Sequence, residues 1–335
     1  MGTGGPEVST LPFSHCLSMT PARVRPGGLA GLLYPAHASM RSDTGPSPPG
    51  AFPLGVRTPR PRAVPLTTSA MSPVDIPAFE PFDSDLVTAR FLRRPNRFVV
   101  HAALEDGEEV RAHLPNPGRM EEILAAGRIL ALEPARRADR KTDWSAILAR
   151  TPDAAGWVSL VTTLPNRLVG EALSTRGLDE LADWQLERSE PTLGGSRLDF
   201  LLSRDDRRMA LEVKSVSLER EGMGLFPDAV TDRGRRHLRE LAEIAGRDGW
   251  EAAVLFVAQR DDVRAVTAAP DIDPAFAEAL DEAREAGVRI LARRCRVTRR
   301  GVALGPALPT PLPEEAPPPE GSSEPDGAPD GARPS

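Results

Sequence analysis

Three residues in two short apolar runs have the types and spacing of a metal-dependent site that cleaves phosphodiester bonds. Asp199 lies in the run 196–202, and Glu212, thirteen residues later, lies with Lys214 in the run 211–216. Two carboxylates can share one Mg²⁺ or Mn²⁺ ion together with waters and a substrate phosphate. The ion would lower the pKa of a bound water, and Lys214 would hold that water or stabilise the developing charge.

Lysine itself is scarce, because Lys141 and Lys214 are the two lysines among 42 basic residues. The bias most simply reflects a GC-rich coding background that replaces exchangeable lysines by arginine. A retained lysine then marks a position where a guanidinium cannot replace an ammonium, since the two differ in shape, hydration and ease of pKa change. Chance retention of both lysines is the alternative, and the count alone does not separate the two.

Strand geometry determines whether the three side chains can meet. Side chains alternate along a strand, so Glu212 and Lys214 project to the same face. If the two runs form an antiparallel hairpin, Ser203 lies opposite Arg208 and Asp199 lies opposite Glu212. Directly opposed Cβ atoms are about 4.5–5.5 Å apart, which suits a shared cation. The alternative is a solvated polar face on an edge strand, with Asp199 at a strand end.

Other polar residues near these runs have more than one interpretation. Glu171, on a preceding predicted helix, is either a third acid near the metal or a solvated helix residue. Gln259, at the end of an apolar run, either lines the same cleft or simply ends the strand. Asn166 is a natural N-cap for the helix that carries Glu171. His237 is interpreted as a structural residue and not as a catalytic one.

Two basic clusters offer contacts to the phosphates of a nucleic acid. Thr231 is a natural N-cap, and the amino end of a helix that starts there favours an anion. The helix would present phosphate contacts through Arg233, Arg235, Arg236 and Arg239. A second cluster, with Arg140 and Lys141, lies beside Trp144 and suits a nucleic-acid groove. A charged outer face is the alternative for each cluster.

The elements that must position these residues fall into two sections. The first section, residues 83–150, alternates apolar and polar residues and predicts a small closed β-barrel, of which the OB-fold is one candidate. Its expected strands are 97–102, 110–114, 128–132 and 144–148, with a helical turn at 120–126. A five-stranded sheet of another topology would give the same pattern.

The second section, residues 155–310, predicts an α/β sandwich around a mixed sheet. Its apolar run 252–257 is typical of a central strand that is covered on both faces. The other expected strands are 157–162, 184–189, 197–202, 209–218 and 288–292. The expected helices are 166–173, 231–245 and 274–286.

Composition separates the two ends from this folded part. The first 70 residues are rich in Pro, Gly, Ser and Thr, and residues 311–335 are rich in Pro and acids. We therefore expect a disordered or over-extended N-terminal segment at 1–82 and a disordered tail at 311–335. The first 70 residues carry about +4 and the tail about −5, so the total of −6 leaves about −5 for the middle. Any nucleic-acid site must be a local patch.

Cysteine usage and hydropathy narrow the class of protein further. Cys16 lies in the expected disordered segment and Cys295 in the folded part, which argues against a disulfide framework or a cysteine zinc site. No run of eighteen apolar residues is present, so no membrane span is expected. We expect a cytoplasmic protein. The sequence leaves open whether the chain forms a homo-oligomer.

Several motifs, in order, resemble the sugar fermentation stimulation protein (SfsA) family over about residues 83–309. The matching stretches are 94–99, 112–120, 140–144, 165–172, 196–200, 212–216 and 226–241. Leu114 and Pro117 depart from the Cys and Thr that are common in the family.

The resemblance implies an OB-like β-barrel followed by a PD-(D/E)xK nuclease-like domain. In that pattern Asp199, Glu212 and Lys214 match the metal and catalytic positions, and Glu171 is a helix acid. The family is described as DNA-binding and is linked to regulation of sugar utilisation, so DNA is the expected partner and Mg²⁺ or Mn²⁺ the expected cofactor.

Three functions stay open on the sequence. The first is a metal-dependent nuclease acting on DNA, which the intact Asp199, Glu212 and Lys214 favour. The second is a DNA-binding regulatory protein that keeps the nuclease architecture without cutting, which the acidic folded part and the family's link to regulation favour. The third is a metal-dependent enzyme with a small phosphorylated or sugar substrate, and this function fits the negative charge best.

Overall fold

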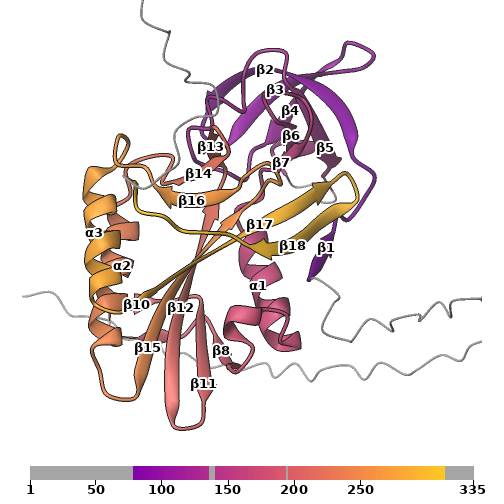
Figure 1. The fold of residues 1–335 in the computed structure, drawn as a ribbon. Coiled ribbons are helices and arrows are strands. Elements are labelled where there is room, and N and C mark those ends of the chain that lie inside the picture. The colour runs from indigo at the N-terminus through magenta and orange to yellow at the C-terminus, as the bar shows by residue number, and fades with distance from the viewer. Residues whose placement is uncertain (1–77, 136–139, 194, 314–335) are drawn as a thin grey trace, which may run out of the picture. The chain divides into compact units, whose positions relative to one another are not determined.

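The structure is a computed structural model that describes residues 78–135, 140–193 and 195–313 (Figure 1). These residues contain two large sheets, one closed into a barrel and one open and mixed. Among the described helices, none is long and apolar enough to cross a membrane. The predictions for 1–77, 136–139 and 314–335 lie outside the described residues.

The first sheet confirms the closed barrel. Its strand order is β4-β3-β2-β5-β6-β7, and β4 also pairs with β6, which closes five of the strands into a barrel. Its interior is apolar, with Val100, Leu130 and Leu132 fully buried. The strands are β2 (Val87–Asn96), β3 (Val99–Leu104), β4 (Glu109–His113), β5 (Ile129–Pro134), β6 (Trp144–Arg150) and β7 (Trp157–Ser159).

Three features of the barrel differ from the sequence prediction. The strand expected at 157–162 is the shorter β7, which pairs with β6 and so belongs to the barrel sheet, not to the second section. The expected helical turn at 120–126 is present but shorter, as a single turn in which Ile123 and Leu124 donate to the Met120 carbonyl at 3.1 and 2.8 Å. The long strand β2 was not expected, because its register shifts twice against β3 and its second half is mostly exposed, which removes a regular alternation.

The second sheet is mixed, as predicted, with strand order β1-β18-β17-β15-β12-β11-β8. β15 runs parallel to both of its neighbours, whereas the other pairs are antiparallel. The strands are β1 (Phe79–Pro81), β8 (Gln185–Ser189), β11 (Phe200–Arg204), β12 (Arg207–Val216), β15 (Trp250–Ala258), β17 (Arg289–Thr298) and β18 (Gly301–Ala307). Since β1 belongs to this sheet, the folded chain begins before the expected boundary at residue 83.

Helices cover both faces of this sheet (Figure 1). α1 (Leu164–Thr175) packs on one face, where its apolar residues join Leu211 and Val213 of β12. α2 (Asp232–Ala245) and α3 (Pro274–Glu285) lie side by side on the other face and pack against Ala210 and Val216. Because helices pack on both faces of the sheet, the apolar run of β15 is buried on both faces, as predicted.

The N-cap of α2 was predicted correctly from the sequence, whereas that of α1 was not. α2 is capped by Thr231, whose hydroxyl accepts the Gly234 N–H at 3.0 Å, as predicted. α1 begins two residues earlier than predicted, with Thr163 at the cap position. Asn166 is therefore not the N-cap but a residue of the first turn, and its side chain is free to point elsewhere.

Smaller elements complete the described part. A three-stranded sheet has the order β13-β14-β16, and a short hairpin pairs β9 with β10. These are β9 (Thr192–Leu193), β10 (Ser196–Arg197), β13 (Leu218–Arg220), β14 (Met223–Phe226), β16 (Ala265–Ala268) and the 3₁₀ turn η2 (Asp179–Leu181). The strand predicted at 197–202 is interrupted and forms the two strands β10 and β11. The strand predicted at 209–218 is also interrupted and forms β12 and β13.

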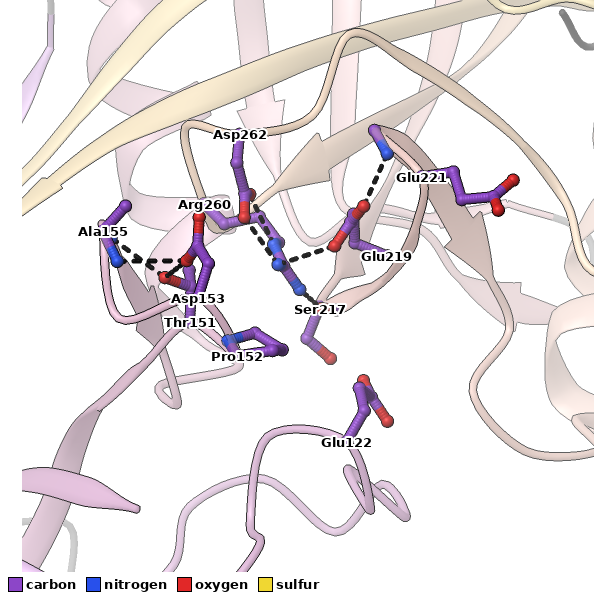
Figure 2. A network of polar contacts seen from close by, with 12 residues as sticks. Glu122, Thr151, Pro152, Asp153, Ala155, Ser217, Glu219, Glu221, Arg260 and Asp262 are labelled. Atoms are coloured by element: carbon purple, nitrogen blue, oxygen red, sulfur yellow. Dashed lines mark hydrogen bonds and ion pairs between the residues drawn. The ribbon is translucent and has the colours of Figure 1, made fainter. Parts of the chain in front are cut away.

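A buried arginine fixes the segments that follow β12 and β15 (Figure 2). The Arg260 side chain is fully buried and donates to both carboxylate oxygens of Asp262 at 2.6 Å. It also donates to Glu219 at 2.9 Å and to the Ser217 carbonyl at 3.1 Å. Figure 2 shows Glu122, from the barrel, in the same region, and burial raises the pKa of this carboxyl although the charge of Arg260 acts to lower it.

Candidate active site

The hairpin of β11 and β12 places Asp199 beside Glu212. Phe200 pairs with Leu211 and Ser203 with Arg208, which confirms the predicted antiparallel register. The pairing ends at Phe200 and Leu211, and Asp199 directly precedes β11. Its carboxylate accepts the N–H of Val213, the residue that follows Glu212 in β12.

The position of β12 rules out the alternative of a solvated edge strand. β12 lies between β11 and β15, and Glu212 and Lys214 pair with Val254 and Phe256 of β15. Glu212 is only 4% exposed. A carboxylate and an ammonium so deep in a sheet cost free energy of desolvation, so they must be compensated by specific partners.

Both carboxylates have such partners. The Asp199 carboxylate accepts the Val213 N–H at 2.7 Å and the Asn166 side-chain amide at 2.5 Å. The Lys214 ammonium donates to Glu212 Oε1 at 2.5 Å. Asn166 thus joins the site from the first turn of α1, a role that a sequence-based interpretation as helix cap did not find.

His237 of α2 is a further member of the site. Its Nδ1 lies 2.5 Å from Glu212 Oε1, and its Nε2 lies 3.3 Å from Arg233 Nε. An arginine only donates, so Nε2 is the acceptor and Nδ1 carries the proton given to Glu212. The sequence prediction of a structural histidine missed this contact, because nothing in the chain between the two residues encodes their approach across the sheet.

The two carboxyl groups have opposite pKa shifts. Burial, reinforced by the negative charge of Glu212, raises the pKa of Asp199 to about 6. Burial also acts to raise the pKa of Glu212, but the hydrogen bond from His237 and the charge of Lys214 outweigh it and hold that pKa below its usual value. Divergent pKa values in a pair of acids are typical of functional sites.

One atom of this cluster lacks a partner. Glu212 Oε2 is buried and accepts no hydrogen bond within the described ranges. A buried carboxylate oxygen with unused acceptor capacity fits a hard divalent cation, which prefers oxygen ligands. The described residues hold no group of three or more His, Cys, Asp or Glu side chains arranged for a metal. Mg²⁺ needs few carboxylates because it keeps several waters, so the donor set suits it.

Two other predicted residues are placed differently. Glu171 is exposed on α1, and the contact from this helix to Asp199 comes from Asn166 instead. Gln259 directly follows β15 and is fully buried, where its Nε2 donates to Ser215 Oγ at 2.8 Å. Gln259 therefore contacts the residue that follows Lys214, and the role of Glu171 as a helix acid stays a prediction.

The basic residues divide into engaged and free groups. Arg233 contacts His237, and Arg235 pairs with Asp232 and with Asp273, the latter at 2.9 Å. Arg236 and Arg239 line a hollow of about 590 Å³ on α2 together with Arg247.

The second basic cluster lies on the barrel. Arg140 donates to Ser145 at 2.8 Å, and Lys141 is exposed. Both predicted clusters therefore keep exposed cations, but Arg140 and Arg235 also serve as structural donors.

Comparisons with known proteins agree with this architecture. Residues 92–160 match the family model described as the SfsA N-terminal OB domain, and residues 163–301 match the one described as the sugar fermentation stimulation protein RE domain. A sugar fermentation stimulation protein homolog of Shouchella clausii is 46% identical over 225 residues, which cover 67% of this chain and 97% of the relative. A homolog of Moorella thermoacetica is 44% identical over 235 residues, which cover 69% of this chain and 96% of the relative.

A solved structure is similar as well. Pyrococcus furiosus SfsA in complex with Ca²⁺ has a TM-score of 0.63 and 29% sequence identity to this chain, and the match covers 71% of this chain and 100% of that one. The two domain matches and the relatives span the barrel and the sandwich together. The chain belongs to the sugar fermentation stimulation protein (SfsA) family.

Proposed function

We propose that this protein binds DNA and cleaves it in a Mg²⁺- or Mn²⁺-dependent reaction at Asp199, Glu212 and Lys214. The observation that carries the proposal is a lysine whose side chain is only 12% exposed, paired with a buried carboxylate and beside a second carboxylate of raised pKa. Such groups destabilise a fold and are typical of sites that bind a cation or a charged substrate. The Ca²⁺ complex of the Pyrococcus furiosus relative supports a divalent-cation site in the family.

The carboxylates of Asp199 and Glu212 would hold the metal. A divalent ion held there supplies positive charge to a phosphate oxygen and lowers the pKa of a bound water. Asn166 and the Val213 N–H orient Asp199, whereas His237 orients Glu212. These contacts leave Glu212 Oε2 as the oxygen without another partner.

Lys214 is positioned to stabilise negative charge on the substrate. Glu212 accepts one of the three N–H groups of its ammonium, so two N–H groups remain. They can donate to the attacking water or to the phosphate oxygen on which negative charge develops. The low exposure of the site strengthens both interactions, because little water screens them.

The DNA backbone would be held by exposed arginines of α2 and of the turn after it. Arg236, Arg239 and Arg247 line one hollow, which is also lined by Asp232, Glu240 and Glu243, and these three arginines form no ion pair within the described residues. Lys141 supplies a further exposed cation on the barrel. Contacts of this kind hold phosphates without reading sequence, and their binding weakens as salt is added.

Cleavage of plasmid and single-stranded DNA by the full chain tests the proposal. We expect cutting with Mg²⁺ or Mn²⁺, no cutting with chelator, and a loss of at least about a hundredfold in Lys214→Met, which removes the stabilising ammonium. Arg300→Met is a charge-matched control, because Arg300 is exposed in the turn between β17 and β18. Equal cutting by wild type and Lys214→Met would remove Lys214 from the mechanism.

One observation favours a second function, a DNA-binding regulatory protein that does not cut. The net charge of the chain is −6, which is unusual for a protein that engages long stretches of DNA backbone. Salt-sensitive retention of DNA without metal-dependent cutting would support this function over a nuclease. Absence of both cutting and retention would favour a small phosphorylated or sugar substrate.

A further inference from the structure

A cavity of about 180 Å³ lies close to the end of β12 but is not part of the Glu212–Lys214 cluster. The loop after β4 contributes Asn116 to its lining, β12 contributes Ser215, and the segment around β14 contributes Phe226 and Asp228. Its volume equals that of about six water molecules. That is room for one flat heterocycle, and too little for a base pair.

The loop on the barrel side of this cavity is held rigidly. The Arg94 guanidinium donates to the carbonyls of Asn116, Gly118 and Arg119 at 3.3, 2.7 and 2.6 Å. A Cβ atom at Gly118 would lie 1.8 Å from Asp228 Oδ2, so the two segments approach as closely as a glycine allows. A cavity preformed in this way loses little conformational entropy when it binds a ligand.

The polar groups in the cavity have unused hydrogen-bonding capacity. Asn116 is 5% exposed, and its Oδ1 accepts the Gly118 N–H at 2.9 Å, while its Nδ2 donates to no group in the described part of the chain. Ser215 Oγ accepts from Gln259, so its own O–H is available to a ligand. The Asp228 carboxylate accepts a hydrogen bond from its own backbone N–H and none from another described residue, and burial raises its pKa against that hydrogen bond and the charges of Arg94 and Arg119.

Positive charge adjoins the cavity. A hollow of about 420 Å³ shares Pro117 and Gly118 with it and is lined by three arginines and one acid, namely Arg94, Arg97, Arg119 and Glu121. The Arg94 guanidinium is engaged by the carbonyls of the loop. In contrast, Arg97 and Arg119 donate no side-chain hydrogen bond within the described ranges. A ligand with a flat polar part and an attached anion would use both spaces.

We propose that this cavity binds the base of a single nucleotide, whose phosphate lies on Arg97 and Arg119. Asn116, Ser215 and Asp228 supply donors and acceptors for the polar edge of the base, and Phe226 supplies an apolar wall. The proposal rests on the nucleic-acid function proposed above and adds the recognition of one unpaired nucleotide to it. Ser215 directly follows Lys214, so such a nucleotide would lie near the strand that carries the cluster.

Fluorescence of 2-aminopurine tests this binding. The full chain is titrated in EDTA, which prevents metal-dependent cleavage, into a single-stranded oligonucleotide with one internal 2-aminopurine and, separately, into 2-aminopurine deoxynucleoside monophosphate. We expect a saturable fluorescence change with at least one probe and about tenfold weaker binding by Asp228→Ala, which loses a buried hydrogen-bond partner. The charge-matched control Asp248→Ala, at an exposed position, should bind within twofold of wild type.

The two probes separate the sources of the nucleotide. Binding of the monophosphate identifies a free-nucleotide site, and binding of the oligonucleotide alone identifies an unpaired base of a strand. Asn116→Asp is a second variant, because it keeps the oxygen that Gly118 requires and removes both Nδ2 donors. Wild-type binding by both variants, or no fluorescence change at saturating protein, overturns the proposal. Cleavage by Asp228→Ala is measured in parallel with Mg²⁺, so failure of cleavage and failure of the cavity are distinguishable.

Discussion

Replacing Asp199 by asparagine is expected to stabilise the fold at neutral pH, although it removes a residue of the proposed site. Burial and the charge of Glu212 raise the pKa of Asp199 from an ordinary 3.8 to about 6. An acid whose pKa is higher in the folded state destabilises the fold as it ionises. The penalty is about 3 kcal/mol, grows between about pH 4 and pH 6, and is fully present above that range.

Asparagine can keep both hydrogen bonds of this carboxylate. Its Oδ1 accepts the Val213 N–H, and its Nδ2 donates to Oδ1 of Asn166 once the Asn166 amide rotates by half a turn. The new bonds are uncharged and somewhat weaker. We therefore expect a gain of about 2–3 kcal/mol at pH 8, or roughly 5–10 °C in melting temperature.

Thermal unfolding of the full chain in EDTA measures this gain at pH 8, pH 6 and pH 4. The advantage of Asp199→Asn should shrink as the pH falls, and the exposed Asp248→Asn control should show little difference at any pH. Added Mg²⁺ should raise the melting temperature of wild type more than that of the variant. The reasoning would be refuted by a variant that is less stable than wild type at pH 8, or by a difference in melting temperature that does not change with pH.

Two further substitutions address the partners of the site and of the network in Figure 2. His237→Ala removes a hydrogen bond that lowers the pKa of Glu212, so the Glu212 carboxyl resonance, followed by ¹³C NMR in EDTA, should titrate at higher pH than in wild type, and an unmoved titration would count against this contact. Arg260→Met leaves Glu219, Asp262 and a carbonyl without their buried donor, so urea unfolding should show a loss of about 2–4 kcal/mol. A loss below about 1 kcal/mol would show that water replaces the guanidinium there.

Sequence patterns predicted the features that depend on near neighbours. The pairing of Ser203 with Arg208 follows from a short turn between two apolar runs, and this pairing alone brings Asp199 to Glu212. The cap at Thr231 and the buried strand β15 are equally local, because side-chain chemistry and apolar length specify them.

Contacts between segments that are distant in the chain could not be predicted from the sequence patterns. Asn166 has the chemistry of a helix cap and of a hydrogen-bond donor to a carboxylate, and only the fold shows that Asp199 lies within its reach. His237 reaches Glu212 because α2 crosses the face of β12, a packing that no spacing encodes. Likewise, the short strands β14 and β16 pair across a long connection, so neither has a local signature of a strand.

The small strand β1 makes the barrel an insertion. Phe79 pairs with Ala303 before the chain has entered the barrel, and the rest of the mixed sheet follows only after the barrel is left. During synthesis, β1 is the first of the described strands to leave the ribosome and its partner β18 is the last, so this pairing closes the largest loop among them. The barrel is thus tethered at both ends to the same sheet. Cutting it away would require two breaks in the chain and a new connection between β1 and α1.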